Sequence, residues 1–227
     1  MRQAAAALLL LLGAGTAAAQ TRSLSGELAV SSELTERGAF VGLRRPIAQA
    51  AVSLYDATGW SVGGALGVPS NGLRNTRVVL RAAHDSPLAD DWQRQVALQY
   101  YGYPGGSPTG RGFDRWEAAL ELRWRDRFMV GMTGFHYLHP ARDTPALQWA
   151  LDAGGRWTLT PLWSGQAALG LARVRDRGTY AYASLGLAWQ AGDWRAEANL
   201  IGTDSQARRL LPSRTPGHLS LVLTRMF

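Results

Sequence analysis

The sequence predicts an all-β protein, a transmembrane antiparallel up-and-down β-barrel of about 12 strands with both termini on the periplasmic side. Three observations predict this fold. Apolar and polar residues alternate along a series of segments, the connections between the segments are alternately short and long, and the last segment ends in the aromatic residue Phe227. Strands of such barrels take about 9–11 residues, with apolar side chains toward lipid and polar side chains toward the lumen.

The N-terminal segment has the features of a secretory signal. Arg2 supplies a positive charge, Ala4–Leu12 an apolar run, and Ala17–Ala19 a small-residue cleavage site. The apolar run is shorter than the about 20 residues that a membrane-spanning helix needs. We therefore expect residues 1–19 to be a cleaved signal peptide and residues 20–227 to form the barrel.

The composition limits the chemistry that the chain can perform. It has no cysteine, which excludes disulfides, thiolate chemistry and a lipid anchor on a cysteine at the cleavage site. The net charge is +7, and every basic residue other than histidine is arginine. Such a charge alone suits an anionic partner. Nucleic acid is not expected, because the chain is secreted and lacks a basic helix or a stacking platform.

Reading the chain at a period of two divides it into successive strands. The clearest is 114–125, where even positions from 116 to 124 hold Trp, Ala or Leu and most odd positions hold Arg or Glu. In the last segment Leu219, Leu221, Leu223 and Phe227 share one face. The expected strands are 23–35, 46–56, 59–69, 76–85, 92–103, 114–125, 127–138, 146–159, 163–174, 179–190, 194–204 and 216–227.

The connections between these segments alternate in length. Short turns are expected at Asp56–Gly59, Asp85–Asp91, Asp126–Arg127, Thr160–Leu162 and Ala191–Asp193. Mostly longer links lie between them, at Glu36–Arg45, Pro69–Asn75, Pro104–Phe113, His139–Pro145, Arg175–Gly178 and Asp204–Thr215. Bacterial barrels have short periplasmic turns and longer external loops, so the long links are expected outside.

Tryptophan marks the expected lipid-facing surface. In the predicted strand phases all nine tryptophans face lipid, and seven lie at the expected periplasmic strand ends together with Phe128 and Phe227. Aromatic rings at this level are typical of a membrane–water interface. The tryptophans are Trp60, Trp92, Trp116, Trp124, Trp149, Trp157, Trp163, Trp189 and Trp194.

Charge separates between the two sides. The short turns are rich in aspartate, whereas the long links carry Arg37, Arg44, Arg45, Arg74, Arg111, Arg142, Arg175, Arg177, Arg208, Arg209 and Arg214. Guanidinium groups pair with phosphate in bidentate fashion. We expect Arg44, Arg45, Arg175, Arg177, Arg208 and Arg209 to face lipopolysaccharide; the alternative is that they serve only solubility. The other expected partners are outer-membrane lipid, small solutes and the barrel-assembly machinery.

The opening of the chain resembles a known family. Ser31–Gly38, followed by Pro46, Gln49, Tyr55 and Gly59–Gly63, is similar to the first strands of the TorF-type porins of proteobacteria. The resemblance covers about a fifth of the chain, and Leu34 stands where that family usually has tyrosine. It implies a pore in the bacterial outer membrane and names no solute. Gly38 suits a turn that needs a positive φ.

Charged residues of both signs are predicted to face the lumen, with arginine slightly ahead. Such groups must pair or meet water, so they either line a wet channel or join into a network that closes it. Barrels of about 8 strands are filled by side chains and those of about 16–18 hold open water, which leaves both outcomes open. Arg125 is also predicted to point inward. The predicted pore-lining residues are Arg77, Arg81, Arg115, Glu117, Glu121, Arg123, Asp152, Arg156, Arg195 and Glu197.

The expected function is passive diffusion of small hydrophilic solutes, anionic ones included, through an outer-membrane porin. Neither a cofactor, nor a metal, nor catalysis is expected, and the oligomeric state is left open. The alternatives are a closed structural or lipopolysaccharide-binding barrel, a lipid-modifying barrel enzyme using His136 with Asp143 in the adjoining loop, and a soluble periplasmic β-sandwich. For the enzyme, no serine is placed as the nucleophile, since Ser107 lies in a different loop. No metal-ligand spacing, phosphate-binding loop or nucleophile elbow occurs in the sequence.

Overall fold

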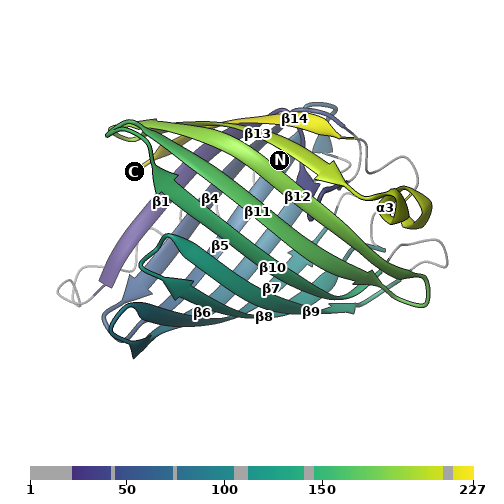
Figure 1. Cartoon of the computed structure of the whole chain (residues 1–227), viewed down its shortest axis with the longest axis horizontal. Helices are drawn as coiled ribbons and strands as arrows, with labels where there is room; N and C mark the ends of the chain where they lie inside the picture. The colour runs from purple at the N-terminus through teal and green to yellow at the C-terminus, as the bar shows by residue number, and fades with distance from the viewer. Residues whose placement is uncertain (1–21, 42–43, 74–75, 105–111, 141–145, 212–216) are drawn as a thin grey trace, which may run out of the picture.

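The computed structural model describes residues 22–41, 44–73, 76–104, 112–140, 146–211 and 217–227. These residues form a closed antiparallel barrel of twelve strands, in which each strand pairs with the next and β1 pairs with β14 (Figure 1). The barrel strands are β1 (Arg22–Ser31), β4 (Ile47–Asp56), β5 (Trp60–Pro69), β6 (Arg77–Ala89), β7 (Trp92–Gly102), β8 (Arg115–Trp124), β9 (Phe128–Tyr137), β10 (Leu147–Thr158), β11 (Trp163–Val174), β12 (Gly178–Ala191), β13 (Trp194–Thr203) and β14 (His218–Met226).

The barrel confirms the predicted fold class and strand count. Most strand limits fall within one or two residues of the expected ones. β1 ends earlier, at Ser31, because the chain then leaves the wall. β6 continues to Ala89, because Asp85 and Ser86 pair with Gln95 and Arg94 of β7 where a link was expected. The expected signal peptide lies outside the described residues.

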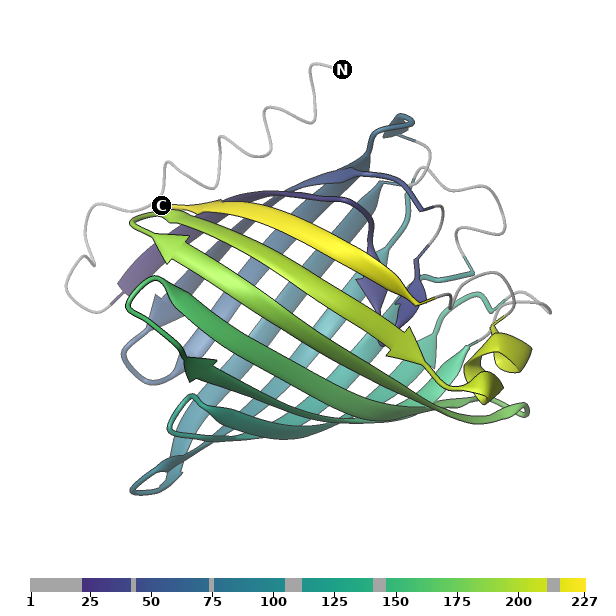
Figure 2. The ribbon, with the colours of Figure 1, turned by 45° about the horizontal axis from the view of Figure 1, so that its top comes forward.

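The two ends of the barrel differ. We call the end with the short connections, near Asp56, Asp126 and Gly192, the turn end; β1 starts there and β14 finishes there. We call the opposite end, with the longer connections, the loop end. Two small elements lie at the loop end: a hairpin of β2 (Thr35–Glu36) and β3 (Ala39–Phe40), and the helix α3 (Ser205–Leu210) (Figures 1 and 2).

The β2–β3 hairpin reverses through two residues with positive φ. Arg37 has φ 49° and Gly38 has φ 77°. Positive φ at both central residues is the requirement of the type I′ turn that joins two-residue hairpins. The expected positive φ at Gly38 is therefore confirmed, although the hairpin itself was not predicted.

Helix α3 is short and capped by its preceding residue. The side chain of Asp204 accepts a hydrogen bond of 2.8 Å from the backbone N–H of Ala207, as a helix N-cap does. Ala207 and the following Leu211 are buried, while Arg208 and Arg209 are exposed. Among the described residues, no helix has the length and apolar character to cross a membrane.

The outer surface of the barrel is apolar. Leu24, Leu185 and Leu200 are each 60% or more exposed. Most outward positions hold leucine, valine, alanine or tryptophan, with a few polar exceptions such as Arg94, His136 and Arg173, whereas most polar side chains of the strands point inward. Such a surface needs lipid around it, because soluble proteins do not expose continuous apolar bands of this extent. The closed barrel rules out the soluble β-sandwich alternative.

The seam between the first and last strands closes the barrel. Its register runs from Glu27↔Met226 to Ser31↔Val222. Beyond it, the N–H of Gly26 donates to the carbonyl of Phe227 at 2.7 Å, and the N–H of Phe227 donates back at 3.0 Å. The ring of Phe227 lies over Gly26, so a Cβ added at Gly26 would be 2.5 Å from Cε2 of that ring.

This contact predicts the effect of a single methyl group. Gly26→Ala should displace the Phe227 ring and lower the free energy of unfolding by about 1–3 kcal/mol. Gly202→Ala is the matched control, because a Cβ at Gly202 would meet no atom within 4 Å. Unfolding midpoints in urea, followed by tryptophan fluorescence in detergent, would measure both. Equal midpoints for the two variants would contradict the packing role of the terminal ring.

Candidate functional site

The candidate site is the lumen, and its inner face is lined by charged side chains. All ten residues that the sequence predicted to line a pore lie on the inner face of their strands. Carboxylates outnumber arginines there by one among the described residues, because Asp85 and Glu36 also point inward. The described inner charges are Arg37, Arg77, Arg81, Arg115, Arg123, Arg156 and Arg195 against Glu27, Glu33, Glu36, Asp85, Glu117, Glu121, Asp152 and Glu197.

The β2–β3 hairpin enters the lumen and binds arginines of the wall. Glu36 accepts hydrogen bonds from Arg77 on β6 at 2.9 Å and from Arg115 on β8 at 2.5 Å. Arg115 also donates to Glu117, two residues along the same strand, at 2.6 Å. The side chains of Arg115 and Glu117 are only 3% and 2% exposed. A carboxylate from a long connection therefore completes a buried ionic network on the barrel wall.

The tip of the hairpin reaches the far wall. Arg37 lies 3.6 Å from Glu117 and 3.9 Å from Asp152 on β10, with its guanidinium 4.6 Å from the centre of the Phe135 ring. Its backbone carbonyl accepts a hydrogen bond of 3.2 Å from the hydroxyl of Tyr180 on β12. The hairpin starts between β1 and β4, so these contacts extend it across the barrel to strands on the opposite side.

Gly38 fits this tip for a steric reason as well as for its φ. A Cβ at Gly38 would lie 2.6 Å from Cγ2 of Thr203 and 2.8 Å from Cβ of Tyr182. Tyr182 in turn donates its hydroxyl to Asp152. The hairpin therefore touches β12 and β13 closely enough that only glycine fits.

The base of the hairpin is held near the seam. The buried Glu33 lies 3.6 Å from His218 on β14 and 3.6 Å from Arg44. The ring of Phe40 stacks on that of His218, with centroids 4.3 Å apart. These contacts tie both sides of the hairpin to the last strand.

An apolar cluster fills much of the loop end beside the hairpin. It joins inward side chains of β9 to β12 with Ala207 and Leu211 at α3, and Ala39 of the hairpin packs against it. Its buried members are Phe135, Tyr137, Ala146, Ala150, Ala172, Val174, Tyr180, Ala207 and Leu211. Hairpin, helix and wall together narrow the lumen at this end, and we call this region the constriction.

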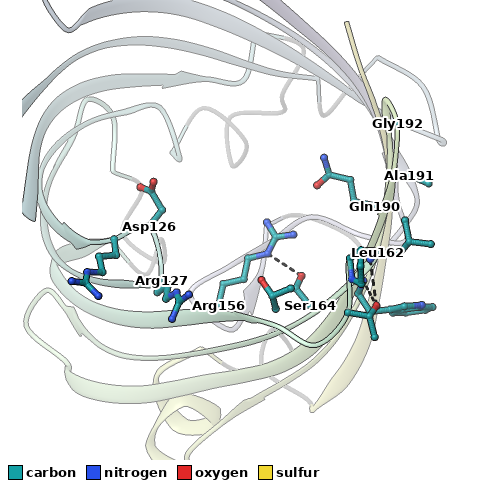
Figure 3. A pocket seen from close by; sticks show the side chains of 13 residues that line it. Asp126, Arg127, Arg156, Leu162, Ser164, Gln190, Ala191 and Gly192 are labelled. Carbon is teal, nitrogen blue, oxygen red and sulfur yellow. Dashed lines mark hydrogen bonds between the residues drawn. The ribbon is translucent and has the colours of Figure 1, made fainter. Parts of the chain in front are cut away.

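The turn end of the lumen is open by comparison. Glu27 and the serines at 23 and 25 point inward and are exposed, and Tyr55 is 40% exposed. A hollow of about 620 Å³ lies at this end, between the β8–β9, β10–β11 and β12–β13 turns (Figure 3). We call it the vestibule. The lumen is thus a funnel, wide at the turn end and narrow at the loop end.

Arg156 points into the vestibule. Its Nε donates to the hydroxyl of Ser164 at 2.9 Å, and Gln190 lies on the neighbouring wall (Figure 3). Among the described residues, no carboxylate lies within ion-pair distance of Arg156. Its guanidinium therefore has a neutral hydrogen-bond partner and no ion pair, while Asp126 lines the same hollow farther away (Figure 3).

Two polar networks cover the middle of the inner face. Arg123 bonds Glu121 and lies 3.8 Å from Asp85, while Arg81 donates to Gln95, which donates to Asp85 at 2.8 Å. On the other side of the lumen Arg195 lies 2.7 Å from Glu197, and Gln166 joins Glu197 to Asn199. These side chains lie flat along the wall in pairs, so they do not cross the lumen as the hairpin does.

Some sequence-based assignments are corrected. Arg37 was placed in an outer loop, but the structure places it inside the barrel, because its type I′ hairpin folds inward. Arg125 was expected to face the lumen but lies in the β8–β9 turn, where it binds Asp91 at 2.7 Å. The arginine surplus expected in the lumen is absent, because Glu36 and Asp85 were assigned to links and not to the inner face.

The loop arginines lie at the loop end. Arg45, Arg175, Arg177, Arg208 and Arg209 are exposed, and Arg44 is exposed but reaches back to Glu33. Arg74, Arg111, Arg142 and Arg214 lie outside the described residues, as do Asp143 and Ser107 of the enzyme hypothesis. His136 faces outward. Within the described part of the chain, no group of three or more histidines and carboxylates is arranged to hold a metal.

Comparison with known proteins places the fold among porins. No family model and no curated protein matches the sequence. Among solved structures, a KdgM porin is similar with a TM-score of 0.60 over 89% of this chain and 98% of that chain, at 8% identity. A NanC porin is similar with a TM-score of 0.56 over 90% and 98% of the two chains, at 11% identity. The chain therefore has the fold of porin-like outer-membrane barrels of its own size.

The charge state of Glu36 follows from its position in the hairpin, outside the strands of the wall. Burial by itself would raise the pKa of this carboxyl. The fields of Arg115, Arg77 and Arg37 and the hydrogen bond from Arg115 outweigh burial, so the pKa lies below its ordinary value of 4.5. The carboxylate thus remains ionised at neutral and mildly acidic pH.

This depressed pKa predicts how the constriction responds to acid. A group with a lowered pKa stabilises its bound state above the ordinary pKa, and the stabilisation is lost as the pH falls through the lowered value. Single-channel conductance should stay constant from neutral to mildly acidic pH and rise only at pH values below 4.5, the ordinary pKa of the carboxyl group. Glu36→Gln should remove most of this step. A conductance change centred at neutral pH would contradict the assignment.

Proposed function

We propose that this protein is an outer-membrane channel for passive diffusion of small hydrophilic solutes, with the inward-folded β2–β3 hairpin as its size-limiting element. The funnel carries the proposal: a wide, polar vestibule leads to a constriction built of ionic pairs. A barrel with only a structural role has no need of an exposed, charged inner wall at one end. The similarity of the fold to the KdgM and NanC porins supports the same reading.

The orientation belongs to the same proposal. With both termini and the short turns in the periplasm, the vestibule opens inward and the constriction faces the cell exterior. The aspartate-rich turns and the exposed arginines of the loop end support this orientation, because arginine suits the phosphates of lipopolysaccharide. The chain would reach this position by secretion, through removal of residues 1–19, and by the barrel-assembly machinery. Its opening sequence supports membership of the TorF-type porins.

Anionic solutes are the proposed preference of the vestibule. The described inner charges include one more carboxylate than arginine, so a preference for anions must come from local groups. Arg156 provides one, since Ser164 and Gln190 leave its charge unneutralised. One neighbour in fold is a KdgM porin in complex with disordered oligogalacturonate, at a TM-score of 0.58.

A closed barrel is the second candidate, and one observation favours it. Arg115, Glu117 and Glu33 have side chains no more than 3% exposed, so water reaches little of the constriction in this conformation. If the hairpin never leaves this position, the protein conducts nothing and serves as a structural or lipopolysaccharide-binding barrel. Conductance in planar bilayers separates the two candidates.

Removing one charge from the hairpin should open the constriction. In Glu36→Gln, Arg77 loses its ionic partner and Arg115 keeps only Glu117, so the hairpin is held less firmly. We expect single-channel conductance at neutral pH to rise roughly two-fold or more, since unpaired buried charges favour hydration. Glu27→Gln, an exposed inward carboxylate at the turn end, is the control and should conduct like the wild type. No channel above background in either variant would remove the pore hypothesis.

Ion selectivity should depend on the free guanidinium of the vestibule. Arg156→Gln should shift the reversal potential in a salt gradient toward cations, by several millivolts or about a two-fold change in permeability ratio. Arg94→Gln is the matched control, because Arg94 lies on the outer wall near the same end and bonds Ser86 at 3.1 Å. If both variants keep the wild-type potential, Arg156 is not on the permeation path.

A further inference from the structure

One sector of the outer wall differs from the rest at the loop end. Seven tryptophans lie near the turn end, whereas Trp116 and Trp149 lie near the loop end, on β8 and β10. Elsewhere the outward positions near the loop end are small or aliphatic, such as Val30, Leu200 and Leu219. The two tryptophans flank β9, so they belong to one local surface.

The strand register joins further side chains to this surface. One row of paired residues runs Ala118↔Gly134↔Trp149↔Arg173↔Thr179 across β8 to β12. Neighbouring members of such a row are about 5 Å apart, and all members face the same side of the sheet. Arg173 is therefore the immediate outward neighbour of Trp149. Together with the adjacent row Tyr100↔Trp116↔His136, this row forms a surface that we call the β8–β11 strip.

The next row, closer to the loops, is aromatic. It runs Tyr100↔Trp116↔His136 over β7 to β9. The rings of Tyr100 and Trp116 are 5.1 Å apart, Trp116 is 41% exposed, and His136 is exposed. A Cβ at Gly134 would meet no atom within 4 Å. Between Trp116 and Trp149 the wall is thus a shallow notch with small residues at its base and aromatic rings at its sides.

Arg173 is exposed on this lipid-facing wall with no ionic partner. Among the described residues it makes no hydrogen bond or ion pair. Leu171, two residues toward the middle of the same strand, is 43% exposed to the hydrocarbon side. An anion stabilises a guanidinium at that boundary, because solvation of a lone charge by lipid tails is unfavourable. Arg175 and Arg177 follow in the exposed turn, and Asp176 between them leaves the group of four with a net positive charge.

We propose that the β8–β11 strip binds one molecule of a phosphorylated glycolipid of the outer leaflet. Its phosphate pairs with the Arg173 guanidinium, and its sugar ring occupies the notch at Gly134 between Trp116 and Trp149. Aromatic side chains with a polar edge suit a sugar at the interface, and arginine suits a phosphate. Charge complementarity supports this occupant, as does the fact that, among the described residues at the loop end, tryptophan and an outward strand arginine come together in this sector alone; at the turn end Arg225 lies over Trp194. The inference rests on the orientation proposed above.

Lipid binding to the intact barrel tests the inference. The full mature protein in detergent micelles is titrated with bisphosphorylated lipid A, with lipid A stripped of phosphate, and with phosphatidylglycerol, and bound lipid is counted by native mass spectrometry. Arg173→Gln should weaken bisphosphorylated lipid A binding about ten-fold, and Trp149→Ala should weaken it several-fold. Arg94→Gln, an outward arginine near the turn end, is the matched control and should bind like the wild type.

Several results would overturn the inference. These are wild-type binding by Arg173→Gln, equal binding of lipid A with and without phosphate, and a dependence on Arg173 for phosphatidylglycerol instead of lipid A. A loss in Arg94→Gln and not in Arg173→Gln would invert the orientation and overturn it too. Conductance is recorded on the same samples: a barrel that binds lipid A through Arg173 but does not conduct refutes the channel and upholds the strip.

Discussion

An ionised group enclosed by a sheet of protein must meet either an opposite charge or water, and this constraint shapes the inside of the barrel. At the loop end the constraint is met by pairing, through Glu36, Arg77 and Arg115. At the turn end it is met by hydration, since Glu27 is exposed and Arg156 has only neutral partners. Along the barrel axis, ion pairing at the loop end gives way to hydration at the turn end, and this change makes the lumen a funnel.

The constriction and the closing seam of the barrel are parts of one arrangement. Immediately after β1, the N–H of Ser32 donates to the carbonyl of Leu221 on β14 at 2.9 Å, and the hydroxyl of Ser32 accepts from Leu221 at 3.1 Å. Ser31 then donates its hydroxyl to the carbonyl of Glu33. The hairpin therefore leaves the wall at a point fixed by both ends of the chain, and its position depends on correct closure.

The sequence predicts the strands of the barrel wall well, but it predicts the inward-folded β2–β3 hairpin of the constriction poorly. Alternation in segments such as 114–125 has a single physical cause, apolar solvent on one side of a sheet, so the period-two pattern reports strands directly. The I′ turn at Arg37 and Gly38 was visible as a turn, but whether a hairpin bends outward or inward depends on partners far along the chain. Arg115, Asp152 and Tyr180 are such partners, and no local pattern links them to Glu36 and Arg37. The only available signal was that the link carries the charged residues Glu36 and Arg37 while the inner faces of the strands carry residues of the opposite charges.

The hydrogen bond between Tyr180 and the carbonyl of Arg37 joins residues 143 positions apart in the sequence. The hairpin is made early in the chain, yet its docking surface consists of strands from the middle and the end, which must already be assembled. A barrel in which β8, β10 and β12 are not yet in place lacks the residues that the tip of the hairpin contacts. Contacts of such long sequence separation are slow to establish. The narrow passage at the loop end is therefore a property of the completed wall and not of the hairpin sequence alone.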